Sequence, residues 1–248
     1  MCFAIISGFI IYLFDIDLAT NPILLCINIP IFGFTIYIGL KLTGFPLRTI
    51  FPNSPNSLST MIWILIMSLG VIIIISDLSN LIYYFFPVDP EVLEIFQMIG
   101  NTGIGLFAAG IIAPITEELF FRSFLISGLL KNYSEFTSIL TSSLLFGMIH
   151  DNIWQSVPAI GMGVFLGWIF VTTKNIWICI FIHSLQNLLF SLLESAEITI
   201  TGLVYSVENG IQFQPLWLDL IGVIMFVMGL YFIKNKNQKN TPEGKYYT

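Results

Sequence analysis

The chain has 248 residues, of which 56% are hydrophobic and 10% are charged, and its net charge is -6. Water-soluble domains carry roughly 25% charged residues and cover their core with a polar surface, so this composition excludes a soluble globular protein and predicts an integral membrane protein in a lipid bilayer. No basic run precedes the tail from Lys234 to Lys245, which disfavours nucleic acid as a partner.

The N-terminal segment, residues 1–21, is short and apolar, and Asp15 and Asp17 lie near its end. Its first 14 residues are few for a span, and no basic residue precedes them as in a signal peptide. A ninth, tilted span, a signal-like segment and a partly inserted or interfacial helix are all compatible with this pattern.

Apolar stretches of about 20 residues predict spanning helices, because lipid gives backbone groups no water partner. Eight such stretches lie between residues 22 and 233, and residues 234–248 are expected to form a solvated polar tail. Polar residues, glycines or prolines mark their boundaries, such as Pro114 between the third and the fourth. The expected fold is therefore an all-α, polytopic membrane domain. Its predicted helices cover residues 22–40, 60–86, 97–113, 115–131, 136–150, 157–173, 175–193 and 216–233.

Counting these crossings predicts how the basic residues divide between the two sides of the membrane. Lys131, Lys174 and the four tail lysines fall on one side, whereas Lys41 and Arg48 fall on the other. By the positive-inside rule, the side with more basic residues is cytoplasmic. Losing or gaining one crossing ahead of a loop would move that loop to the other side.

Ionisable residues inside predicted spans are costly in lipid, so each is a functional candidate. Asp77 and Asp219 lie near the ends of their helices, where a membrane interface accounts for them.

Glu117, Glu118 and Arg122 are different, because they share one apolar helix. With about 100° per residue, Arg122 lies about 40° from Glu118 and about 140° from Glu117. Glu118 and Arg122 are therefore expected to pair, which leaves Glu117 free to accept a proton from water or bind a metal. An ion pair that only fixes helix packing is the alternative.

The two histidines of the chain add two further polar positions. His150 closes the helix after the one with Glu117, and the short connection between these helices makes them antiparallel neighbours that bring both residues to one depth. Phe146, one turn earlier, either walls a site there or is an ordinary core residue. His183 and Asn187 lie one turn apart, far from the helix ends, and must face protein or a wet cavity. His150 as an interfacial cap, and His183 with Asn187 as an interhelical packing pair, are the structural alternatives.

Together, Glu117-Glu118-x-x-x-Arg122, Phe146-x-x-x-His150 and His183-x-x-x-Asn187 resemble the signature of the CAAX prenyl protease and bacteriocin-processing family, also called the Abi family. The resemblance covers residues 98–195. It implies eight membrane helices around a conical, water-filled polar cavity, and intramembrane endopeptidase activity. The implied substrate is a membrane-associated peptide or protein; in eukaryotic relatives it is a prenylated tail, so a lipidated substrate is one expectation.

Carried over to this sequence, the resemblance implies that Glu117 and His150 activate the water that attacks the scissile carbonyl. His183 and Asn187 would stabilise the oxyanion, a role suited to an uncharged amide donor. Glu117, His150 and His183 could also supply three ligands for a catalytic zinc or another divalent metal, although the H-E-x-x-H motif is absent. The sequence leaves metal dependence open.

Two other classes of function are weighed against the enzyme. A catalytically idle immunity or scaffold protein has no need for all of these polar residues, and a proton-coupled transporter would more often show two related halves, which this sequence lacks. The endopeptidase is therefore favoured. Frequent Ile, Asn and Lys residues suggest an AT-rich microbial genome, and hence a microbial cell membrane.

Overall fold

In a computed structural model, the structure describes residues 28–44, 46–88, 102–150, 152–196, 198, 200–203 and 211–240. The N-terminal segment expected at residues 1–21 lies outside these residues, and so does the tail beyond residue 240. A short 3-10 turn, η2 (Leu47–Ile50), precedes the second long helix. The longer helices are α2 (Asn28–Thr43), α3 (Leu58–Phe85), a continuous helix from α5 to α7 (Gly103–Leu129), α8 (Glu135–Met148), α9 (Ile153–Thr173), α10 (Ile176–Ser195) and α11 (Leu216–Asn240).

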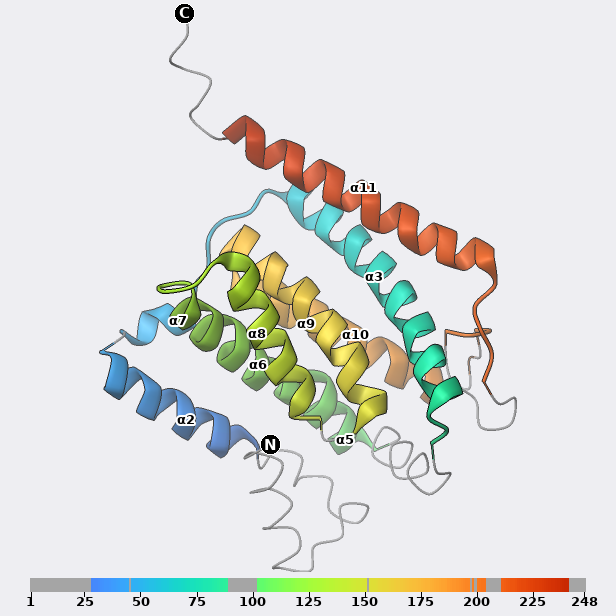
Figure 1. The fold of residues 1–248 in the computed structure, drawn as a ribbon, viewed down its shortest axis with the longest axis horizontal. Coiled ribbons are helices and arrows are strands. Elements are labelled where there is room, and N and C mark those ends of the chain that lie inside the picture. Colours follow the sequence, from blue (N-terminus) through green and yellow to red (C-terminus); the bar gives the residue numbers. More distant parts are fainter. Residues whose placement is uncertain are drawn as a thin grey trace, which may run out of the picture.

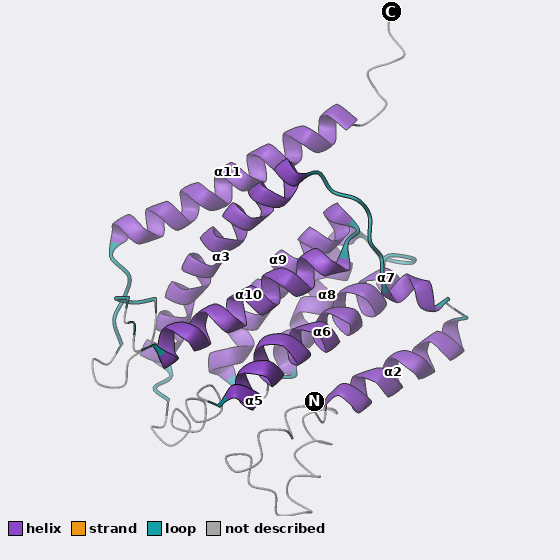
Figure 2. Cartoon of the chain, turned by 180° about the vertical axis from the view of Figure 1, so that it is seen from behind, coloured by secondary structure: helices purple, strands orange, loops and turns teal. Residues whose placement is uncertain are grey.

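The predicted all-α, polytopic architecture is confirmed, and the chain is an integral membrane protein. Among the described residues, five helices are long and apolar enough to cross a membrane: α3, Gly103–Leu129, α9, α10 and α11. The helices α2 and α8 are shorter, with 16 and 14 residues. In both views of the fold, α11 and α3 lie side by side at one edge, α2 lies at the opposite edge, and the remaining helices pack between them (Figures 1 and 2).

The prediction of separate spans at residues 97–113 and 115–131 is wrong, because one helix, Gly103–Leu129, runs through Pro114. We call it the motif helix, since it contains both glutamates and Arg122. Proline lacks an N–H and usually breaks or kinks an α-helix. Here the backbone widens into a π-helix over Ala108–Ile112, just before α6 (Ala113–Glu118), where the proline sits in the first turn. A local π-helical turn is a known way for a helix to accommodate such an interruption.

Merging two predicted spans into one also corrects the predicted sides of the basic residues. Lys41 and Arg48 lie on the way from α2 to α3, and this connection contacts the turn between α9 and α10. Asn175 Nδ2 donates to Asn53 Oδ1 at 3.0 Å, while Ser54 N–H donates to the Lys174 carbonyl at 3.0 Å. The prediction that Lys41 and Arg48 lie across the membrane from Lys174 is therefore wrong. All three lie at one end of the bundle.

Close helix packing holds α3 against α11. A Cβ added to Gly70 would lie 2.5 Å from the Gly222 carbonyl oxygen, so only glycine fits at this crossing. Nearer the other ends of the two helices, the rings of Trp63 and Phe232 stack with centroids 3.9 Å apart. Without water between them, membrane helices associate through such close packing of small residues. The helix α11 also continues to Asn240, past the end expected at residue 233.

Candidate active site

The motif helix holds its two glutamates between two π-helical segments, Ala108–Ile112 and Leu119–Ile126. π-helical turns occur often at functional sites, because they re-aim the side chains that follow. The Glu118 side chain is fully buried, and Arg122 Nε lies 3.0 Å from Glu118 Oε2. The predicted pairing of Glu118 with Arg122 is thus confirmed. Glu117 points elsewhere, with 14% of its side chain exposed.

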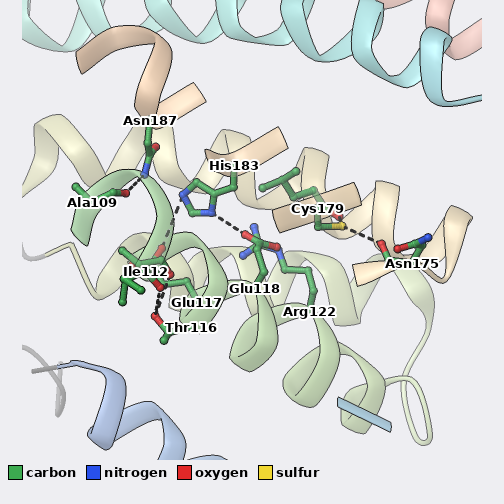
Figure 3. A network of polar contacts seen from close by, with 12 residues as sticks. Ala109, Ile112, Thr116, Glu117, Glu118, Arg122, Asn175, Cys179, His183 and Asn187 are labelled. Atoms are coloured by element: carbon green, nitrogen blue, oxygen red, sulfur yellow. Dashed lines mark hydrogen bonds and ion pairs between the residues drawn. The ribbon is translucent and has the colours of Figure 1, made fainter. Parts of the chain in front are cut away.

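The ring of His183 lies between the two glutamates (Figure 3). Its Nδ1 is 2.8 Å from Glu118 Oε1, and its Nε2 is 3.8 Å from Glu117 Oε2. A carboxylate accepts hydrogen bonds, so Nδ1–H donates to Glu118 and the ring is held with Nε2 toward Glu117. Sequence reasoning missed this contact. Helical geometry predicts neighbours within the motif helix, but Glu118 and His183 come from different helices.

His150 lies in the turn after α8, and its ring is fixed by the same helix. Its Nδ1 lies 2.9 Å from the carbonyl oxygen of Phe146. Because a carbonyl can only accept, Nδ1 carries the proton, so Nε2 is the nitrogen that can act as a base when the ring is neutral. The Phe146 ring contacts the rings of both His150 and His183, at centroid distances of 5.0 and 5.8 Å. The Arg122 guanidinium lies over it at 4.6 Å. Phe146 is therefore buried in the core and also walls the site.

Asn187 is held by a backbone carbonyl that Pro114 leaves without a donor. In the π-helical turn, the Ala113 N–H bonds to Ala108 O rather than to Ala109 O. The next possible donor to Ala109 O is the nitrogen of Pro114, which has no hydrogen. Asn187 Nδ2 donates to this carbonyl at 2.8 Å (Figure 3). The amide keeps a second N–H, and its position is fixed across two helices.

Four of the six predicted site residues line one cavity of about 530 Å³: Glu117, His150, His183 and Asn187. Glu118 and Arg122 lie behind this wall. A cavity of this size is in the range of small-ligand and peptide sites. The helix α3 contributes polar residues that sequence reasoning did not identify, among them Ser76 and Asn80. The signal was present, since Asn80 is a buried polar residue within an apolar span.

The same part of α3 holds the chain that returns to α11. Gln214 N–H donates to Asp77 Oδ1 at 3.2 Å, and Ser76 Oγ donates to the Leu203 carbonyl at 2.8 Å. Gly202 turns the chain there with a φ of +72°, and a Cβ on it would collide with the Gln214 backbone nitrogen. Backbone of this kind favours glycine. We call this arrangement the Gly202 turn, and its Leu203 lines the cavity beside α3.

Metal ligation by Glu117, His150 and His183, which was considered from the sequence, stays a prediction. Within the described ranges, no three His, Cys, Asp or Glu side chains lie close enough together to hold one metal ion. Glu117 and His183 are neighbours, but His150 does not join them in such a group, and its Nδ1 is occupied by Phe146. A catalytic zinc normally needs three protein ligands. No step of the proposed chemistry is therefore assigned to a metal.

Comparisons with known proteins support the resemblance of the three motifs. Residues 100–189, which include all six predicted site residues, match the family described as "Type II CAAX prenyl endopeptidase Rce1-like". The chain is 29% identical over 108 residues to the "Putative membrane peptidase YdiL" of Bacillus subtilis, covering 42% of this chain and 44% of that protein. It is 31% identical over 122 residues to the "Membrane-embedded CAAX protease MroQ" of Staphylococcus aureus, covering 46% and 49%.

A third relative is the "UPF0177 protein YxdF" of Lactococcus lactis, 30% identical over 83 residues, which cover 33% of this chain and 45% of that protein. The chain thus matches a little less than half the length of each of these relatives. No solved structure matches it. The predicted resemblance to the CAAX protease family is confirmed.

Proposed function

We propose that this chain, whose residues 100–189 match the Rce1-like CAAX endopeptidase family, is an intramembrane endopeptidase. It would hydrolyse a peptide bond in a membrane-associated peptide or protein. One observation supports the proposal most: His183 lies between Glu118 and Glu117, and Glu117 and His150 line the same cavity. A carboxylate and a basic imidazole nitrogen at one cavity wall are the groups that general-base catalysis needs.

Glu117 and His150 Nε2 would activate the water. One of them takes a proton as the water oxygen forms a bond to the scissile carbonyl carbon, and the carbonyl oxygen becomes an oxyanion. When the carbon–nitrogen bond breaks, the proton passes to the leaving amine. The products are a carboxylic acid and an amine, so atoms and charge balance. Glu117→Gln would remove the carboxylate base while keeping the shape of the side chain.

His183 and Asn187 would stabilise the oxyanion. Their hydrogen bonds to Glu118 and to the Ala109 carbonyl determine which N–H groups remain for this role. His183 gives its Nδ1–H to Glu118, so it can donate to an oxyanion only if Nε2 also carries a proton. The role therefore requires an imidazolium, whose positive charge faces Glu118 on one side and the cavity on the other. Asn187 would use the N–H that Ala109 does not take. Preorganised donors of this kind are often the largest single contribution to catalysis.

The substrate is expected to be a peptide or protein, and a lipid-modified one remains an expectation from the family. The relative MroQ is named a CAAX protease, whereas the relative YdiL is named only a membrane peptidase. The cavity lining contains no Lys or Arg within the described residues, so no permanently charged side chain is present there to bind a free C-terminal carboxylate. This favours cleavage within a chain over removal of a single terminal residue.

The test is cleavage of a panel of quenched fluorescent peptides, some carrying a prenylated cysteine, by the purified protein in detergent. Glu117→Gln should abolish cleavage, whereas the matched change Glu135→Gln, at the far end of α8, should leave it unchanged. A parallel reaction with a chelator examines metal dependence. Cleavage that survives in Glu117→Gln would contradict the proposed mechanism.

A further inference from the structure

We propose, on the basis of the proposed endopeptidase function, that the cavity opens at the extracytoplasmic face of the membrane. The substrate would then be an exported or membrane-anchored peptide whose scissile bond lies in the outer half of the bilayer. A tail presented from the cytoplasm would not reach the site. Three observations carry this inference: the position of the cavity along the bundle, the core that fills the rest of the bundle, and the distribution of the basic residues.

The cavity occupies one end of the helical bundle. Its lining uses the last turns of α3, from Ile75 to Tyr83, and the first turns of α9, from Trp154 to Met162. It also includes the C-terminal half of α10 and Leu203 of the Gly202 turn. These elements meet at one end: Trp154 Nε1 donates to the Phe86 carbonyl at 2.6 Å. We call this the cavity end.

Packed side chains fill the bundle between the site and its other end. Beyond Glu118, the core continues through Ile126, Ile139 and Leu166, of which Ile126 and Leu166 are fully buried. A second cluster of Phe32, Phe121 and Phe146 closes the space between α2 and the motif helix. Protein cores of this density leave no path for a peptide. A substrate can therefore reach Glu117 from the cavity end but not through the opposite end.

The opposite end carries nearly all basic residues of the chain, and we call it the basic end. The connections between α2 and α3, between the motif helix and α8, and between α9 and α10 all lie there, as does the end of α11 (Figure 1). Of the nine Lys and Arg residues, Arg122 is buried with Glu118 and Lys245 lies beyond the described residues. The other seven lie at the basic end: Lys41, Arg48, Lys131, Lys174, Lys234, Lys236 and Lys239.

Among the described residues, the cavity end has no counterpart to these charges. The sequence has no Lys or Arg between Arg48 and Arg122, between Lys131 and Lys174, or between Lys174 and Lys234. The positive-inside rule counts Lys and Arg in short loops and near helix ends. Every such residue within the described part of the bundle lies at one end, so the rule assigns the basic end to the cytoplasm. The cavity end then faces the other compartment.

The orientation is tested by the accessibility of single cysteines in bacterial cells that express the chain. The parent protein carries Cys2→Ser and Cys26→Ser. Its remaining cysteine, Cys179, is fully buried. Thr201→Cys places a thiol on the exposed turn at the cavity end, and Asn132→Cys places one in the exposed turn at the basic end. A membrane-impermeant maleimide should label Thr201→Cys in intact spheroplasts, and Asn132→Cys only after permeabilisation.

A second pair of variants replaces the first if one of those fails to fold. Phe213→Cys lies at the cavity end and Tyr133→Cys at the basic end, and the native side chains there are exposed, Phe213 by 44% and Tyr133 by 58%. Labelling of a basic-end cysteine in intact spheroplasts, alone or together with its partner, overturns the proposed orientation. The parent without an added cysteine reports background labelling in every case.

The substrate side is tested with a quenched peptide that carries a sulfonated, membrane-impermeant fluorophore. Right-side-out spheroplasts should cleave it at once, whereas inside-out vesicles should cleave it only after detergent is added. The reverse pattern overturns the proposed substrate class. Absence of cleavage even in detergent contradicts the endopeptidase itself, and with it the substrate class, but the cysteine labelling still decides the orientation. The two failures are therefore distinguishable.

Discussion

His183 Nδ1 and Glu118 Oε1 lie 2.8 Å apart, and this contact links a buried ion pair to a cavity wall. Arg122 neutralises Glu118 from one side, while Glu118 orients the His183 ring from the other. Metal-binding and catalytic histidines are commonly oriented by a carboxylate in this way. Glu118 thus acts as a positioning residue for His183 in the proposed mechanism, in addition to its role as the partner of Arg122.

The two adjacent glutamates should respond differently to the same substitution. Glu117→Gln should lower kcat by roughly a hundredfold or more with an unchanged melting temperature in detergent, because it removes a base but little packing. Glu118→Gln should lower the melting temperature, since breaking a buried ion pair costs about 3–5 kcal/mol. It should also lower kcat, because His183 loses its orienting partner. Equal melting temperatures for the two variants would contradict this division.

Asn187 should contribute to both stability and turnover. Asn187→Ala removes the bond to Ala109 and should cost about 1 kcal/mol of unfolding free energy. If the remaining N–H binds the oxyanion, kcat should also fall by roughly a hundredfold or more, with little change in KM. Thermal unfolding and steady-state kinetics on the same preparation measure the two effects. A loss of stability with normal kcat would leave Asn187 as a packing residue alone.

Pro114→Ala should raise stability and lower activity. Proline is about 3 kcal/mol less favourable than alanine inside a helix, so the substitution should stabilise the motif helix. Alanine at position 114 has a backbone N–H that can donate to a carbonyl of the preceding turn. The Ala109 carbonyl then has a second possible donor, which weakens its hydrogen bond with Asn187. The readout is a higher melting temperature with a reduced kcat.

A double-mutant cycle provides the control for this prediction. Pro114→Ala in an Asn187→Ala background should have much less effect on kcat than in the native chain, because both substitutions act through one contact. Additive losses of activity would mean that Pro114 affects the site by another route.

The α3–α11 contact should be sensitive to one methyl group. Gly70→Ala would place a Cβ against the Gly222 backbone and should destabilise the protein by about 1–3 kcal/mol. Gly33→Ala, in α2, is the matched control, because nothing lies within 4 Å of its added Cβ. That variant should be neutral or slightly more stable, since alanine is the better helix former. Equal melting temperatures would show that the contact with Gly222 is not tight.

Local rules were enough to predict part of this molecule. Apolar stretches identified the positions of α3, α9 and α10, and the spacing of Glu118 and Arg122 predicted their pairing. Antiparallel neighbours correctly predicted that Glu117 and His150 share one cavity. The rules failed where a tertiary contact decides the outcome. Pro114 reads as a helix end from sequence, because only the surrounding structure shows that the π-helical turn and Asn187 accommodate it.

The error at Pro114 also shows why orientation is hard to predict from sequence. Because Pro114 was taken as a break, one helix was counted as two crossings. This error placed Lys41 and Arg48 on the wrong side of the membrane relative to Lys174, although the positions of all basic residues in the sequence were known. The contact between Glu118 and His183 was likewise out of reach, since no periodicity relates residues of two helices that are distant in the chain. Positions that depend on such long-range contacts are the ones for which the three-dimensional structure is needed.

The Gly202 turn has a consequence for motion in the bundle. It fastens α3 to the segment that leads into α11, while Gly70 and Gly222 fasten the two helices to each other further along. Two well-separated attachments prevent a hinge between them, so α3 and α11 are expected to shift as one rigid body. Any widening of the cavity on this flank must therefore displace about fifty residues of helix through lipid together, a slow collective movement on the microsecond-to-millisecond scale.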